Sequence, residues 1–203
     1  MKIYTGEQQT EEWHKLRLGK FTSFDFHIFF GNSTTKEKEL FAKAAERITS
    51  RRSDSKNFSN KHIDRGNELQ EDAILMYELQ KNVKVESVAF VELNKNVGCS
   101  PDGLIGTDGI IEVKCPDDPI FLKSCVKGIK GVIPTYKTQV QFAMYVTNRS
   151  WCDFIYYNPN FKDPIHVIRI DRDDDKIEEI KEQLIKCEED IKNILDQYRR
   201  EKC

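Results

Sequence analysis

The sequence lacks the patterns that mark several classes of protein. It has no apolar run of bilayer length, no secretory leader, no internal repeat and no Walker-type phosphate loop. Its six cysteines include no Cys-x-x-Cys pair, and its four histidines share no spacing, which disfavours a zinc site or an iron–sulfur cluster. We therefore expect a cytoplasmic chain with reduced thiols, no membrane contact and no use of ATP.

An excess of positive charge is also missing, because the formal net charge is −2. Basic residues are nevertheless clustered within 51–61 and 123–137, whereas acidic residues concentrate within 171–179. Such clustering permits a local basic channel for nucleic acid, although a charge run is more commonly a solvated face. With 203 residues, of which 38% are hydrophobic, the chain is expected to form one domain, residues 1–203, around a sizeable core.

Apolar periodicity and turn residues predict helices and strands in alternation. The expected helices are 11–18, 36–50, 61–80, 117–128, 134–146 and 173 to about 198, and the expected strands lie within 83–93, 109–115, 151–157 and 165–171. Thr22 and Ser23 are expected to cap a further helix through Phe26 and Phe29, and the polar segment 51–60 is the candidate mobile segment. The pattern predicts an α/β (α+β) fold, a central mixed β-sheet flanked by helices with a long C-terminal helix.

Three residues around one predicted hairpin have the character of a hydrolytic metal site. Asp102 lies in a Pro-Asp-Gly turn, Glu112 follows after nine residues, and Lys114 comes two positions later. Because side chains alternate along a strand, Glu112 and Lys114 share one face, and the Val113 carbonyl lies between them. Two converging carboxylates suit Mg²⁺ or Mn²⁺, with the carbonyl as a further ligand, and a nearby lysine can orient or deprotonate a bound water. The pattern indicates phosphodiester hydrolysis, and a hairpin with a surface charge pair is the alternative.

The wider set of motifs resembles a known family. Asp102, Glu112 and Lys114 are similar to the signature of the PD-(D/E)XK nuclease superfamily. Over roughly residues 11 to 175, the ordered motifs resemble the phage lambda exonuclease (YqaJ-like alkaline exonuclease) family. These motifs are Glu12-Trp-His-Lys-Leu-Arg-Leu-Gly19, Thr22-Ser23, Cys99-Ser-Pro-Asp-Gly-Leu104, Glu112-Val-Lys-Cys-Pro116 and Gln139-Val-Gln141.

The resemblance implies a restriction-endonuclease-like fold and a single exonuclease domain. It implies a Mg²⁺-dependent 5′-to-3′ exonuclease, with Mn²⁺ as a substitute metal, acting on the ends of linear double-stranded DNA. Such an enzyme releases mononucleotides and leaves a 3′ single-stranded tail for recombination by single-strand annealing. The implied assembly is a ring-shaped homotrimer that works with a single-strand annealing protein, in the cytoplasm of a bacterium or a phage-infected host cell.

Two further acid positions follow from the resemblance. The family places a Glu in a Gly-x-x-x-Glu pattern on the helix before the sheet, where this chain has Gly66 and Gln70. Gln70 therefore takes a catalytic position, but its neutral amide puts a second tightly bound metal in doubt. Glu92 lies ten residues before Asp102, as does an accessory acid of the family. An exposed strand residue is the alternative for Glu92.

The resemblance also implies a pocket for a 5′-terminal phosphate. Its residues would be Arg17, Thr22 or Ser23, Ser100 and Gln139, and Tyr136 is a further candidate for DNA contact. The family pattern Thr-Ala-Ser is replaced here by Thr22-Ser23-Phe24, so one hydroxyl position is lost. Gln139 lies within an apolar helical stripe, and the alternative is a buried glutamine with an internal partner.

Three alternative functions remain open. An endonuclease or nickase would use the same metal site without needing a DNA end. A non-catalytic DNA-binding relative is favoured by Gln70 but opposed by the intact Asp102, Glu112 and Lys114. A structural metal module is disfavoured because the Cys and His residues are not clustered.

Overall fold

The protein is a mixed α/β molecule, seen here in a computed structural model that describes residues 1–31, 34–52 and 61–202, with side chains omitted for 61–68. Its described strands form two four-stranded sheets rather than one central sheet. An isolated bridge pairs Glu86, in the segment before residues 90–94 of one sheet, with Leu104, in a strand of the other sheet. Residues 53–60 of the candidate mobile segment lie outside the described residues.

One sheet has the strand order β5-β6-β7-β8. Its strands are β5 (Gly103–Ile105), β6 (Gly109–Lys114), β7 (Trp151–Tyr157) and β8 (Ile165–Asp171), and the last three lie close to their predicted ranges. Strands β6 and β7 are parallel, whereas the outer pairs are antiparallel. A parallel pair requires a long crossover, which explains why two helices separate β6 from β7 along the chain.

The second sheet has the order β1-β3-β4-β2. Its strands are β1 (Lys2–Tyr4), β2 (Phe21–Thr22), β3 (Phe90–Asn94) and β4 (Val97–Cys99). The sequence pattern did not predict β1 and β2, which are two or three residues long and are held by partners far along the chain. The predicted strand region 83–93 narrows to β3 and the bridge at Glu86.

The helices match the predicted ranges closely. They are α1 (Glu11–Arg17), α2 (Thr34–Thr49), α3 (Lys61–Lys81), α4 (Asp118–Lys127), α5 (Pro134–Thr147) and α6 (Asp174–Lys202), with short 3₁₀ helices η1 (Phe26–Phe30) and η3 (Gly128–Gly131). Proline at the start of α5 suits the first helical turn, where its missing N–H costs no bond. No helix in the described ranges combines the length and apolarity needed to cross a bilayer.

The predicted cap at Thr22 and Ser23 is wrong. Thr22 ends strand β2, and the next helix, η1, starts after Asp25 without a side-chain capping bond. The Thr22 hydroxyl instead donates to Asp25 Oδ1 at 3.0 Å. Residues 21–22 form a strand rather than a helix cap because Phe21 and Thr22 pair with Val97 and Gly98 of β4. The local sequence does not reveal this pairing.

Two hydrophobic clusters cover opposite faces of the β5–β8 sheet. Ile110 and Val140 belong to the larger cluster, which includes most of α5. Ile111 and Val113 belong to the smaller cluster with Tyr77 of α3. Strand β6 is therefore buried on both faces, with α5 on one side and α3 on the other.

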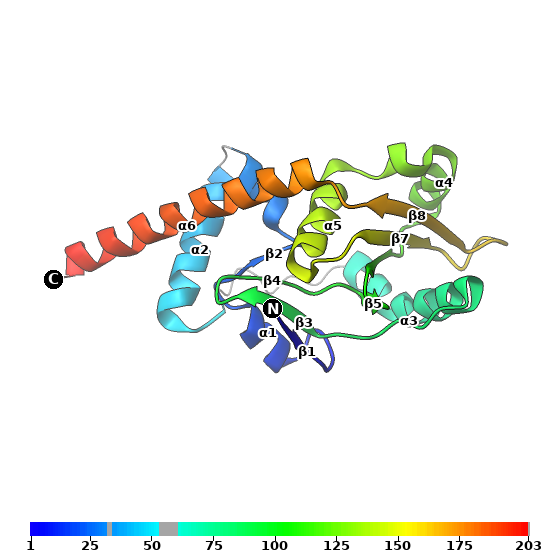
Figure 1. Ribbon diagram of the computed structural model, residues 1–203, viewed down its shortest axis with the longest axis horizontal. Helices are drawn as coiled ribbons and strands as arrows, with labels where there is room; N and C mark the ends of the chain where they lie inside the picture. The colour runs from blue at the N-terminus through cyan, green and yellow to red at the C-terminus, as the bar shows by residue number, and fades with distance from the viewer. Residues whose placement is uncertain (32–33, 53–60, 203) are drawn as a thin grey trace.

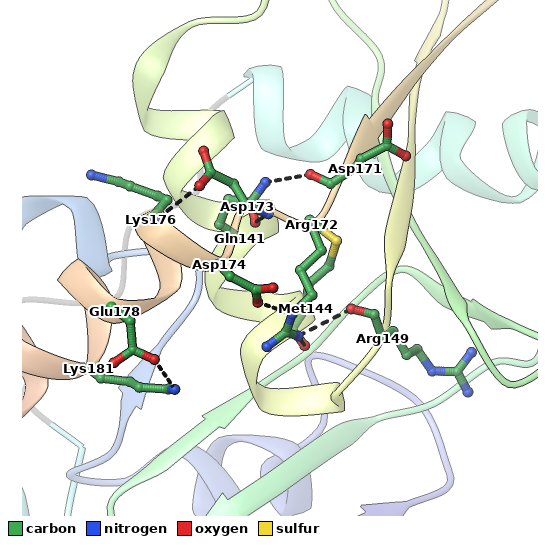
Figure 2. Close-up of polar contacts among 10 residues, drawn as sticks. All are labelled: Gln141, Met144, Arg149, Asp171, Arg172, Asp173, Asp174, Lys176, Glu178 and Lys181. Carbon is green, nitrogen blue, oxygen red and sulfur yellow. Dashed lines mark hydrogen bonds and ion pairs between the residues drawn. The ribbon is translucent and has the colours of Figure 1, made fainter.

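A polar junction attaches the long helix α6 to α5 (Figure 2). Gln141 donates to the Asp171 carbonyl and accepts from the Asp173 N–H, both at 2.9 Å. Arg172 bonds the Asp174 carboxylate and the Met144 carbonyl. Beyond this junction α6 crosses α2, and its C-terminal turns extend away from the rest of the molecule (Figure 1).

Candidate active site

Strand β6 presents Glu112 and Lys114 on the face toward α5. Their neighbours Ile111 and Val113 point to the opposite side and pack against α3. Alternation along an extended strand produces this arrangement. Glu112 is only 5% exposed, so its carboxylate lies within the fold rather than on a solvated surface.

Asp102 reaches β6 from the turn before β5. Its Oδ2 accepts the Val113 N–H at 2.7 Å, and its Oδ1 accepts the Gln70 amide at 3.0 Å. Strand β5 pairs with β6 only as far as Ile111, which leaves the edge of β6 open at Val113. Because the N–H and C=O of one strand residue point to the same edge, the Val113 carbonyl also faces the Asp102 side.

The site combines a buried acid, Glu112, and a half-buried acid, Asp102, with the Lys114 ammonium. Burial and the neighbouring Glu112 carboxylate raise the pKa of Asp102 to about 7. Burial lowers the pKa of Lys114, but the Glu112 and Asp102 carboxylates outweigh that effect and hold it above its ordinary value. Lys114 is therefore an ammonium group, and it donates to Glu112 Oε1 at 2.5 Å.

Helix α5 completes the surroundings of Glu112. Gln139 is 7% exposed and donates its amide to Glu112 Oε1 at 2.6 Å. Tyr136 lies one turn earlier, and its ring centre is 5.0 Å from Lys114 Nζ. Both residues were predicted to contact DNA, which stays a prediction, and within the protein Gln139 contacts the acid pair.

A second cluster gathers around Arg17 at the end of α1. The Arg17 guanidinium donates to Ser100 Oγ at 3.2 Å and to Thr22 Oγ1 at 3.3 Å. The indole N–H of Trp13 also donates to Ser100 Oγ, and the Arg17 guanidinium lies 4.3 Å from the Trp13 ring centre. Burial lowers the pKa of Arg17 more than the nearby Asp25 and Glu46 carboxylates raise it.

The Arg17 cluster brings together three predicted residues and one that the sequence reasoning missed. Thr22 and Ser100 each accept a hydrogen bond from Arg17, whereas Ser23 is buried. Trp13 had been noted only as part of a motif. Its position four residues before Arg17, on the same face of α1, was the signal that it would lie against the guanidinium.

The Arg17 cluster and the acid pair are neighbours along one short segment. Ser100 contacts Arg17, and Asp102, two residues later, contacts Val113. Cys99 immediately precedes Ser100 and is fully buried, and burial raises the pKa of its thiol. Cys99 is a neutral packing residue.

Glu92 lies in β3, in the other sheet. Its Oε1 pairs with Lys20 Nζ at 2.8 Å, and its Oε2 accepts the Tyr4 hydroxyl at 2.9 Å. The bond from Lys20 lowers the pKa of Glu92 more than burial raises it. The described contacts of Glu92 do not join it to Asp102 or Glu112.

The donor set of the acid pair fits a hard divalent cation. Carboxylate oxygens of Asp102 and Glu112 and the Val113 carbonyl are the oxygen ligands that Mg²⁺ and Mn²⁺ prefer. A divalent cation at the pair would offset the burial and the Glu112 repulsion that raise the pKa of Asp102. Within the described residues, no group of three or more His, Cys, Asp and Glu side chains gathers around one point.

Comparison with known proteins agrees with this architecture. The chain superposes on an alkaline exonuclease, LHK-Exo, from Laribacter hongkongensis with a TM-score of 0.86 and 28% identity, covering 95% of this chain and 97% of that one. The same enzyme in complex with dAMP matches with 29% identity over the same shares of the two chains and the same TM-score of 0.86. A phage-related exonuclease from Haemophilus somnus 129PT shares the fold, with a TM-score of 0.69 and 17% identity, over 88% of this chain and 96% of that one.

A search of curated proteins finds no match for this chain. The family model of the YqaJ-like viral recombinase domain, in contrast, matches residues 12–150. These residues contain the Arg17 cluster, the acid pair and Gln139. The chain therefore belongs to the YqaJ-like viral recombinase domain family.

Proposed function

We propose that this chain is a divalent-metal-dependent exonuclease that degrades linear duplex DNA from a 5′ end. The observation that carries the proposal is that Ser100, which contacts Arg17, lies two residues before Asp102 of the acid pair. An alkaline exonuclease of similar structure supports the nuclease activity, and its complex with dAMP supports mononucleotides as products. We take the whole chain as a single exonuclease domain.

In this proposal, the Arg17 cluster binds the DNA end and the acid pair supports hydrolysis. Arg17 binds the 5′-terminal phosphate with its forked guanidinium, and Thr22 and Ser100 add hydroxyls. Asp102, Glu112 and the Val113 carbonyl would hold the metal, which when bound would supply Lewis-acid chemistry at the scissile phosphate and at the attacking water. Lys114 remains an ammonium and stabilises the negative charge that develops on the phosphate.

The proposed metal is Mg²⁺, with Mn²⁺ as a substitute, because all the proposed ligands are oxygen atoms. Membership of the family also supports a homotrimeric ring around DNA, a single-strand annealing protein as partner, and a role in recombination through the remaining 3′ tail. We place this activity in the cytoplasm of a bacterium or a phage-infected cell. Light scattering on the purified chain tests the trimer directly, since a monomer would contradict it.

The deciding experiment uses linear duplex DNA with one strand 5′-phosphorylated and labelled at its 3′ end. The purified protein is incubated with this DNA and Mg²⁺, beside closed circular DNA and beside the Lys114→Ala variant. We expect stepwise shortening from the 5′ end, no cutting of the circle, and a rate at least about a hundredfold lower for the variant.

Each other outcome rejects part of the proposal. Cutting of the circle means an endonuclease or nickase, and shortening from the opposite end reverses the polarity. Retained DNA binding without cleavage in Mg²⁺ or Mn²⁺ means a non-catalytic relative. Circular dichroism of the Lys114→Ala variant shows whether its loss of activity reflects chemistry or misfolding.

A further inference from the structure

We propose that Asp25 and Lys43 are positioning residues for the Arg17 cluster, which would bind the 5′-terminal phosphate of DNA. This inference rests on the proposed function, because it concerns the end phosphate of the proposed substrate. Asp25 lies between strand β2 and the 3₁₀ helix η1, and Lys43 lies on α2. Asp25 contacts Thr22 of the cluster, and Lys43 contacts Asp25.

A chain of hydrogen bonds runs from Arg17 through Thr22 to Asp25. The Arg17 guanidinium donates to Thr22 Oγ1 at 3.3 Å, and the Thr22 hydroxyl donates to Asp25 Oδ1 at 3.0 Å. A threonine hydroxyl has one proton and two acceptor lone pairs, so it makes both bonds at once. Because Asp25 takes the proton, the hydroxyl presents a lone pair to Arg17. Asp25 thereby sets the direction in which Thr22 holds the guanidinium.

Lys43 holds the other oxygen of Asp25 from inside the fold. Its ammonium donates to Asp25 Oδ2 at 3.2 Å and to the Lys20 carbonyl at 2.8 Å, and the residue is only 2% exposed. The ring centres of Phe21 and Phe29 lie 5.4 and 5.7 Å from Lys43 Nζ. An ammonium confined in this way fixes the rotation of the Asp25 carboxylate that it contacts.

Stability alone does not account for a buried lysine at this place. Replacing a buried ion pair by apolar residues of similar size is often neutral or stabilising, because burial removes both charges from water. The pair also has an electrostatic consequence for the cluster. Lys43 offsets the charge of Asp25, which would otherwise repel a phosphate bound at Arg17. The pair therefore orients the cluster without adding net negative charge to it.

Two double variants that both remove the ion pair test the inference. Asp25→Asn with Lys43→Met keeps an amide oxygen that can accept from the Thr22 hydroxyl, whereas Asp25→Ala with Lys43→Met leaves no acceptor. Steady-state cleavage of duplexes with 5′-phosphate and 5′-hydroxyl ends gives the ratio of kcat/KM for the two substrates. We expect the Asn variant to keep most of the wild-type ratio. We expect the ratio for the Ala variant to fall about tenfold, through a higher KM for phosphorylated ends.

An unchanged ratio in the Ala variant, or an equal loss in both variants, would overturn the inference, because the acceptor for Thr22 would then be irrelevant. Partial unfolding cannot imitate the expected result, since a smaller folded fraction lowers both rates equally. If the Ala variant does not fold, Asp25→Leu with Lys43→Met replaces it, because leucine resembles aspartate in shape but offers no acceptor.

The wild type separates this inference from the proposed function. A wild type that prefers phosphorylated ends, together with an Ala variant that keeps the preference, refutes only the positioning role of Asp25 and Lys43. A wild type that cleaves DNA with no such preference refutes phosphate binding by the Arg17 cluster and its positioning together. A wild type that cleaves no DNA refutes the proposed function.

Discussion

Gln139 of α5 donates its amide to the same Glu112 oxygen that accepts the Lys114 ammonium, so one carboxylate oxygen joins the helix to strand β6. The bond from Gln139 measures 2.6 Å, and both Gln139 and Glu112 are buried. The core packing of α5 thus sets the position of a candidate metal ligand. Changes on α5 are expected to affect stability and chemistry together.

Gln139→Met tests this coupling. The substitution keeps the volume but leaves Glu112 with one fewer donor, so the free energy of unfolding should fall by about 1–3 kcal/mol. Cleavage of 5′-phosphorylated duplex should fall as well, because Glu112 loses its fixed orientation. Urea unfolding and a DNA cleavage assay measure the two effects. Wild-type stability in the variant would show that the bond contributes nothing.

Arg17→Lys tests the phosphate cluster. Lysine keeps the charge but loses the fork that spans Ser100 and Thr22 and the contact with the Trp13 ring. We expect the preference for 5′-phosphorylated over 5′-hydroxyl duplex ends to fall by about tenfold or more. The ratio of initial rates on the two substrates measures the preference, and Arg200→Lys, at an exposed position on α6, is the matched control. An unchanged ratio would place the end phosphate elsewhere.

The sequence predicted the parts of this protein that depend on local pattern. Alternation along 109–115 predicted the shared face of Glu112 and Lys114, and apolar periodicity predicted the long last helix. The sequence pattern did not predict contacts between distant segments. Strand β1 exists only because Lys2–Tyr4 pairs with β3, and Thr22 joins a strand because its partner Gly98 lies far along the chain.

The same distinction holds within the candidate site. The residue types at 102, 112 and 114 indicated metal-dependent hydrolysis, but the sequence did not reveal which residue each side chain contacts. Gln139 was expected at a DNA phosphate, and its described partner is Glu112. Glu92 was proposed as an accessory acid from its spacing to Asp102, and its described partners are Lys20 and Tyr4, so that role stays a prediction. Gln70, also proposed from spacing, does contact Asp102.

Glu92→Gln separates an ion-pair role from a role in the reaction. The pKa of Glu92 is lowered, so its contribution to stability is present above the ordinary value of 4.5 and is lost as pH falls through the lowered pKa. We expect the variant to lose less than about 1 kcal/mol near neutral pH, with a flatter decline in acid. Urea unfolding across the acid range measures this. DNA cleavage at the wild-type rate is expected, and a large loss of cleavage with intact stability would make Glu92 part of the active site.

Tyr77→Phe tests how α3, the helix that carries Gln70, is held against the sheet. Tyr77 is 1% exposed and donates to Asp153 Oδ2 at 2.5 Å, and Arg169 donates to both oxygens of Asp153. Near neutral pH the variant should lose about 1.5–3 kcal/mol of unfolding free energy, because the lost bond is to a charged acceptor. Asp153 keeps Arg169, so the helix should remain folded.

The pH dependence of this loss gives a second, independent readout. Burial and the bond to Asp153 raise the pKa of Tyr77 above its ordinary value of 10.0. The stabilisation is therefore full below about pH 10 and declines as pH rises, because the unfolded tyrosine ionises first. The stability difference between wild type and Tyr77→Phe should shrink by about 1.4 kcal/mol for each pH unit above 10. Urea unfolding of both proteins near neutral pH and above pH 10 measures it. An equal difference at both pH values would mean that Tyr77 ionises no later in the folded protein than in the unfolded chain.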